Sequence, residues 1–169
     1  MKLIREQMKD LRALYINQVR LMLSAEQQIV RALPRMIEKS TDNELREAFR
    51  SHLRETENHV TRIEGILHHS TAEPGEEKCK VVAALVDEAE EMIQDSADTT
   101  VRDAALIAAA QRVEHYEIAA YGTLRHFAQV MGLEGDVEIL NQTIQEEGHA
   151  DHLLSAIAER INPAAQKAA

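Results

Sequence analysis

The chain has 169 residues, a formal net charge of −10 and 44% hydrophobic residues. This length suits a single domain over 1–169, and the hydrophobic fraction excludes an intrinsically disordered chain. The negative charge disfavours a nucleic-acid partner, because phosphate binding requires a basic face. No apolar run approaches the roughly 20 residues of a membrane-spanning helix, and MKLIREQMKD lacks the apolar stretch of a signal peptide. We therefore expect no binding to membranes. Cys79 is the single cysteine, so no internal disulfide can form, and we expect a cytoplasmic protein.

The composition predicts an all-α protein, because only six Gly and three Pro interrupt a chain rich in Ala, Leu, Glu and Gln. The first helix is expected over about 3–39, with a kink or break at Pro34. The cluster Ser40–Asn43 supplies N-caps for a second helix over about 43–69. Pro74-Gly75 then marks a loop.

A shorter amphipathic helix is expected over about 78–95, within the long connection that follows this loop. The turn residues Ser96–Thr99 precede a long helix over about 100–131, and the glycines of Gly132–Gly135 end it. The last helix is expected over about 136–161, stopped by Asn162-Pro163, with a frayed tail over 162–169.

These elements make two helical hairpins with tight turns, joined by one long crossover. Tight turns force neighbouring helices to run antiparallel, whereas the crossover allows the second and third long helices to run parallel. The predicted fold is therefore a ferritin-like antiparallel four-helix bundle, with a short fifth helix in the crossover between long helices two and three.

Polar and acidic side chains interrupt the apolar stripe of every long helix. Placed at about 100° per residue, most of them lie within the stripe, and Glu55 and Glu114 lie on its shoulder. Their distances from the tight turns put them within one or two helical turns of a common height, at a rise of about 1.5 Å per residue. The set comprises Glu26, His52, Glu55, His59, Glu114, Glu117, Glu147 and Asp151.

A buried layer of carboxylates needs a neutralising partner, because an unpaired buried charge costs several kcal/mol. No Lys or Arg lies within the stripes at this height, so we expect two metal ions. Carboxylates with one or two imidazoles favour two iron ions, with manganese or a mixed iron–manganese pair as alternatives.

The pattern leaves two alternatives open within the ligand set. At least one of His52 and His59 is expected to bind metal, but the sequence does not say which. In the last helix, Glu146-x-x-His149 matches a known di-iron spacing. His149 points away from the apolar stripe, however, which favours Glu147 and Asp151.

Two further residues near this layer have expected roles. Tyr121 lies one turn beyond Glu117 and is placed to donate a hydrogen bond to it. Cys79, in the crossover, is expected to pack rather than to take part in redox chemistry.

Several segments resemble the YciE/YciF-type bacterial stress proteins, a group of ferritin-like domains. They include YINQVRLMLSAEQQIVRALPRM, FRSHLRETENHVTRIEGIL, KCKVVAALVDEAEE, VRDAALIAAAQRVEHYEIAAYGTLRHFA and TIQEEGHADHLL. The resemblance implies a cytoplasmic homodimer with a rubrerythrin-like metal site and a role in stress. It places ligands at Glu26 in SAEQQ, Glu55 in HLRET, Glu114 and Glu117 in VEHYE, and Glu147 and Asp151 in EEGHAD.

The leading functional hypothesis is a di-iron protein that reacts with dioxygen or hydrogen peroxide, as a ferroxidase or peroxide scavenger. Glu26 with Glu117 or Glu114 would be terminal ligands, and Glu55 and Glu147 would bridge. One alternative is a protein that holds metal without catalysis, and another is a purely structural bundle. A DNA-binding shell is disfavoured by the net charge.

Overall fold

The computed structural model describes residues 8–75 and 77–167, and these residues form five α-helices and no strand. The all-α class predicted from the composition is confirmed. In chain order the helices are α1 (Leu11–Lys39), α2 (Asn43–His69), α3 (Lys80–Asp95), α4 (Thr99–Val130) and α5 (Glu134–Ala165).

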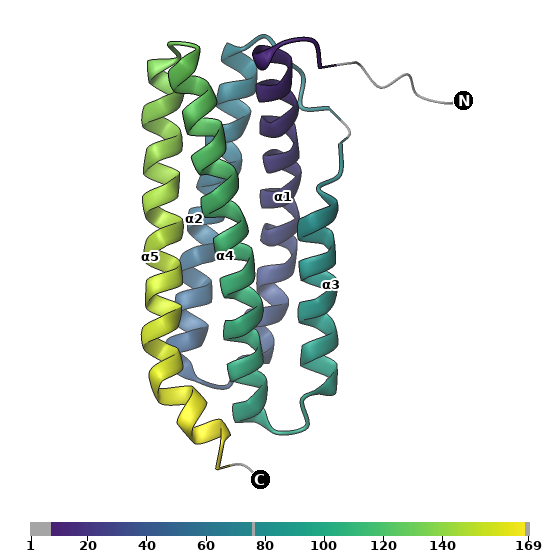
Figure 1. The fold of residues 1–169 in the computed structure, drawn as a ribbon. Coiled ribbons are helices and arrows are strands. Elements are labelled where there is room, and N and C mark those ends of the chain that lie inside the picture. Colours follow the sequence, from purple (N-terminus) through teal and green to yellow (C-terminus); the bar gives the residue numbers. More distant parts are fainter. Residues whose placement is uncertain (1–7, 76, 168–169) are drawn as a thin grey trace, which may run out of the picture.

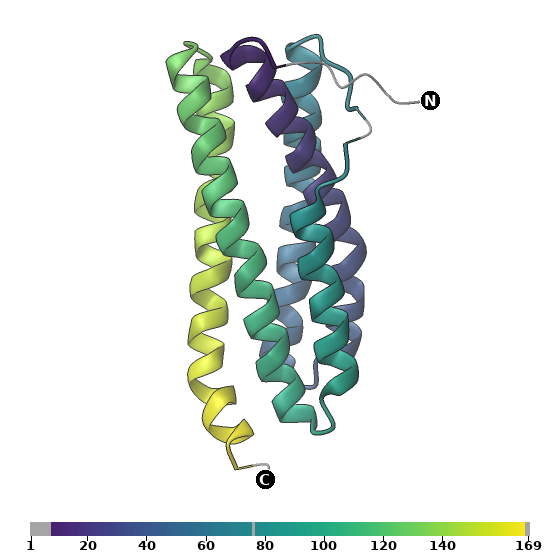
Figure 2. The ribbon, with the colours of Figure 1, turned by 45° about the vertical axis from the view of Figure 1, so that its right-hand side comes forward.

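Four long helices form the bundle, and α3 packs along one side of that bundle (Figure 1). α1 and α2 make one antiparallel hairpin, and α4 and α5 make the other. The crossover through α3 returns the chain to the opposite end of the bundle, so α2 and α4 run in the same direction. α3 packs against both α1 and α4, and Figure 2 shows it beside them. The ferritin-like arrangement predicted from the turn lengths is therefore confirmed.

The first helix begins later than predicted and ends at Lys39, as predicted. Met8 to Asp10 are not helical, and α1 begins at Leu11 because the Asp10 carboxylate accepts a hydrogen bond from Ala13 N at 2.7 Å. The predicted helical residues 3–7 lie outside the described part of the chain. Of the kink or break predicted at Pro34, the break does not occur, since α1 continues to Lys39. Near a helix end a proline removes one backbone hydrogen bond, and buried side chains on either side hold the last turn against the core.

The predicted end of the last helix was also wrong. α5 continues through Asn162-Pro163 to Ala165, so 162–165 are helical rather than frayed. Ile161 is buried and anchors this last turn, and a proline there again removes only one donor. The end of the helix turns inward beneath the lower end of the bundle (Figure 1). Residues 168–169 of the predicted tail lie outside the described chain.

Acidic side chains fix the lower end of the bundle. Asp42 caps α2 by accepting hydrogen bonds from two backbone amides at 3.0 Å, as the turn residues predicted. The buried carboxylate of Asp103 in α4 accepts from Thr41 N at 2.9 Å, Thr41 Oγ1 at 2.6 Å and Asp42 N at 2.9 Å. These bonds tie the α1–α2 turn to the first turns of α4, and so set how high the two hairpins stand against each other.

Apolar side chains fill the bundle above and below its middle. Fully buried examples from the long helices are Tyr15, Phe49, Ile66 and Leu140. None of the helices in the described part of the chain is long and apolar enough to cross a membrane. Between the apolar layers lies a band of buried polar side chains.

Replacing Asp42 by Ala should destabilise the chain more than replacing Asp98 by Ala. Both residues cap a helix through two backbone amides, and losing such a cap costs about 1 kcal/mol. Asp42 also accepts from Arg160 Nη1 of α5 at 2.6 Å, so its loss also removes one contact between α5 and the start of α2. Urea unfolding followed by circular dichroism would measure both free energies of unfolding. Equal losses would contradict a contribution from the Arg160 contact.

Candidate metal centre

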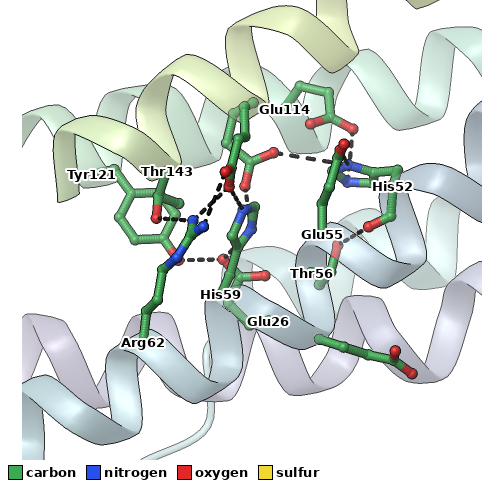
Figure 3. Close-up of polar contacts among 12 residues, drawn as sticks. Glu26, His52, Glu55, Thr56, His59, Arg62, Glu114, Tyr121 and Thr143 are labelled. Carbon is green, nitrogen blue, oxygen red and sulfur yellow. Dashed lines mark hydrogen bonds and ion pairs between the residues drawn. The ribbon is translucent and has the colours of Figure 1, made fainter. Parts of the chain in front are cut away.

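Six of the eight predicted side chains meet in the middle of the bundle. All six are at most 6% exposed, and all four long helices contribute at least one. They are Glu26 from α1, His52 and His59 from α2, Glu114 and Glu117 from α4, and Glu147 from α5. Figure 3 shows the labelled members facing one another across the bundle.

The six residues form two clusters that share one carboxylate. His52, Glu114, Glu117 and Glu147 make the first, and Glu26, His59 and Glu147 make the second. Within each cluster, one potential ligand atom from every residue lies within 4.8 Å of all the others. Because Glu147 has two oxygens, it can serve both clusters at once.

The two histidines lie at opposite ends of this double cluster. His59 Nδ1 is 2.9 Å from Glu147 Oε1 and 3.5 Å from Glu26 Oε1. His52 Nε2 is 3.3 Å from Glu114 Oε1, and His52 Nδ1 is 4.0 Å from Glu147 Oε2. The sequence left open which histidine joins the carboxylates, and the structure brings both to them.

Most polar atoms of these residues have no hydrogen-bond partner among the described residues. The unpartnered atoms are Glu26 Oε2, His52 Nδ1 and Nε2, His59 Nδ1, Glu114 Oε2, and both carboxylate oxygens of Glu117 and of Glu147. The distances between them are short in places, but the angles are not those of hydrogen bonds. A buried polar atom left without a partner costs about 1–3 kcal/mol, and more when it is charged. Such a concentration of unpartnered donors and acceptors is suited to binding an additional partner at this place.

Burial and mutual repulsion perturb the carboxylates. Burial raises the pKa of Glu114 and of Glu117 well above the usual range, and neighbouring carboxylates add to the effect. Glu147 behaves differently: burial alone would raise its pKa, but the adjacent imidazoles of His59 and His52 lower it. The shared residue is thus the one most readily ionised.

The histidines carry the compensating protons. Burial alone would lower the pKa of His52, but Glu114 and other nearby carboxylates raise it to about 9. Burial alone would also lower the pKa of His59, but Glu147 and Glu26 raise it to about 11. Without metal, protons on imidazoles and carboxylates neutralise the site, and metal binding must displace them.

Two contacts outside the clusters orient their members. His59 Nε2 lies 2.8 Å from Glu146 Oε2, which holds a proton on that nitrogen and turns Nδ1 towards the cluster. Arg62 fixes Glu146 in turn, donating from Nη2 to Oε1 at 3.0 Å. Burial would raise the pKa of Glu146, but hydrogen bonds from Arg62 and His59 lower it to about 2.

Tyr121 makes the second orienting contact. Its buried hydroxyl donates to Glu26 Oε1. We predicted Glu117 as the acceptor, and the structure corrects this: the tyrosine reaches across to α1 rather than back along α4. The sequence carries a weak signal for the Glu146 contact, because Arg62 lies three residues after His59 on the same side of α2. It carries none for the tyrosine contact, which depends on the direction of one side chain.

Glu55 and Asp151 lie outside the two clusters. The Glu55 side chain is 34% exposed, and its Oε2 is 3.9 Å from His52 Nδ1. Asp151 accepts from Gln111 Nε2 at 3.0 Å and lies 3.3 Å from Nε2 of the exposed His115. His149 is exposed, as the helical stripe predicted.

The donor set fits divalent or trivalent cations. Four carboxylates and two imidazoles converge from four helices, and the described residues bring no lysine or thiolate into either cluster. Two adjacent clusters joined by one carboxylate can hold two ions close together. Fold and site thus define a ferritin-like helical bundle with buried carboxylate–imidazole clusters that can hold metal ions.

Comparison with known proteins places the chain in a family. Residues 10–167 match the family described as a domain of unknown function, DUF892, and the chain belongs to it. It is 38% identical over 162 residues to the protein YciF of Escherichia coli, covering 95% of this chain and 96% of YciF. The resemblance noted in the sequence is therefore confirmed.

Two solved structures share the fold. The crystal structure of the E. coli stress protein YciF superposes with a TM-score of 0.89 at 37% identity, covering 92% of this chain and 99% of the other. YcfI from Rhodopseudomonas palustris superposes with a TM-score of 0.86 at 37% identity, covering 89% and 96%.

The metal-free chain should become less stable as the pH rises from about 6.5 to 9. The pKa of His52 is raised from 6.5 to about 9 on folding, so its stabilising contribution is complete below about 6.5 and is lost as the pH approaches 9. The raised pKa values of Glu114 and Glu117 act in the same direction, because their ionisation inside the fold is unfavourable. Thermal unfolding in the presence of chelator should show a melting temperature about 4 °C or more lower at pH 9. A melting temperature that rises over this range would contradict the assigned protonation.

Proposed function

We propose that this chain is a carboxylate-bridged di-iron protein that oxidises Fe(II) with hydrogen peroxide or dioxygen, as a ferroxidase or peroxide scavenger. One observation carries the proposal: two buried clusters share Glu147, and most of their polar atoms lack a hydrogen-bond partner within residues 8–75 and 77–167. Carboxylates with imidazoles suit iron, with manganese or a mixed pair as the alternative.

Each cluster would hold one ion. Glu26, His59 and Glu147 would bind the first, and His52, Glu114 and Glu117 with Glu147 would bind the second. When bound, two such ions supply the two electrons that reduce one peroxide molecule to two water molecules.

The protein's own residues prepare this chemistry. Glu146, held by Arg62, keeps a proton on Nε2 of His59 and aims Nδ1 inward, so that Nδ1 is the nitrogen that gives up its proton when metal binds. Tyr121 donates to one oxygen of Glu26, and the other oxygen has no hydrogen-bond partner among the described residues. Glu55, at the solvent edge 3.9 Å from His52, is proposed as a further ligand on that side.

The biological setting of the proposal comes from the relatives. YciF is described as a stress protein, and we extend that role to this chain. We also propose a homodimer, as the family resemblance implies. The two buried clusters lie within one chain, so the proposed chemistry does not depend on a second copy.

Iron loading followed by peroxide addition tests the proposal. Metal-stripped chain should take up about two Fe(II) per chain without oxygen, and one equivalent of peroxide should oxidise them. Turnover should then repeat as long as further Fe(II) is supplied as the reductant, and near-ultraviolet absorbance follows it. Glu147→Gln should bind less than one ion and react at least about 10–100-fold more slowly, since even loss of an outer partner of a metal ligand has that effect.

Glu138→Gln is the matched control, because Glu138 lies on the same helix and is exposed. It should bind and oxidise iron like the unaltered chain. Two ions bound without oxidation would replace the proposal by metal storage or structural metal binding. No uptake of iron or manganese would refute it.

A further inference from the structure

A cavity of about 300 Å³ lies where α3 covers the contact between α1 and α4. All three helices line it, mainly with apolar side chains. The wall includes Ile29 and Leu33 of α1, Val86 and Ile93 of α3, and Ala110 and Val113 of α4. The alanines of α4 leave room that larger side chains would fill. The volume is about twice that of an engineered apolar cavity that binds benzene.

The inner end of this cavity reaches the candidate metal centre. His52 and Glu114 are the two cluster members in its wall. Both are almost fully buried, and both carry atoms without a hydrogen-bond partner among the described residues. A molecule in the cavity would therefore touch apolar walls along its length and the polar edge of the first cluster at its tip.

The outer end of the cavity favours an uncharged ligand. Arg35 lines the mouth, and its guanidinium is already paired, at 3.4 Å from Glu90 and 3.1 Å from Glu38. Arg31 and Asp87 complete the mouth with charges of opposite sign. The rim therefore carries no excess charge that would select an anionic or cationic head group.

We propose that this cavity binds a neutral, apolar organic molecule and presents it to the His52–Glu114 edge of the metal centre. Dioxygen alone would need far less space than this cavity offers, and hydrogen peroxide would find few polar partners along its walls. The inference deepens the proposed function, on which it rests for the presence of metal, by naming the class of a second substrate. The cavity itself can be tested without metal.

Fluorobenzene binding followed by fluorine NMR tests the cavity. The metal-free chain should bind one molecule in a saturable manner. Val86→Phe should weaken binding at least about tenfold, or about 1.4 kcal/mol, because the larger ring occupies volume within the cavity. Val81→Phe is the matched control on the same helix, since Val81 is 52% exposed and outside the cavity wall, and it should bind normally.

The position of the ligand is tested by loading metal. Bound fluorobenzene should relax much faster in the manganese-loaded chain than in the zinc-loaded chain, because only manganese is paramagnetic. Absence of saturable binding, equal loss in both variants, or dissociation of a dimer by Val86→Phe in sedimentation would overturn the proposal. The last result would show that a second copy covers this face. Fluorobenzene binding by a chain that takes up no metal would instead refute the proposed function and leave the cavity as a binding site.

Discussion

Buried carboxylates that lack partners are the constraint on which this structure depends. Glu117 and Glu147 are fully buried, and neither carboxylate has a hydrogen-bond partner among the described residues. In a bundle of this size each unpaired charge costs several kcal/mol, comparable to a large part of the total stability. Protons can neutralise the layer at the expense of stability at high pH, whereas cations can neutralise it at neutral pH. The two clusters could accommodate the second solution, since the ligand atoms of each lie within 4.8 Å of one another.

The surrounding hydrogen bonds hold these buried side chains in position. Arg62 acts through Glu146 on one imidazole, and Tyr121 acts on Glu26 from the opposite helix. Each contact satisfies one polar atom of a cluster member and leaves another free. The tie between Asp103 and the α1–α2 turn sets the relative height of the hairpins, on which the meeting of ligands from four helices depends. The apolar cavity under α3 then gives one edge of the same site access to uncharged molecules.

The sequence predicts much of this, for a physical reason. Helical periodicity and tight turns determine which side chains face inward and at what height, so the inward positions of Glu26, Glu117 and Glu147 follow from the pattern. The burial of residues on the shoulder of a stripe does not follow from this pattern. Glu114 is buried because α3 packs on α4 in addition to two other helices, while Glu55 on α2 has no such cover and is one-third exposed. The break and the helix end predicted at two prolines were wrong because a proline near a helix end costs less free energy than burial of the last turn contributes.

The central claim is that cations, rather than protons, occupy the middle of this bundle. Anomalous diffraction from crystals of iron-loaded chain, recorded on both sides of the iron absorption edge, tests it most directly. The account predicts two neighbouring peaks on either side of Glu147, one against His52 and Glu114 and the other against Glu26 and His59. Peaks confined to the protein surface, or none within the bundle, would contradict it.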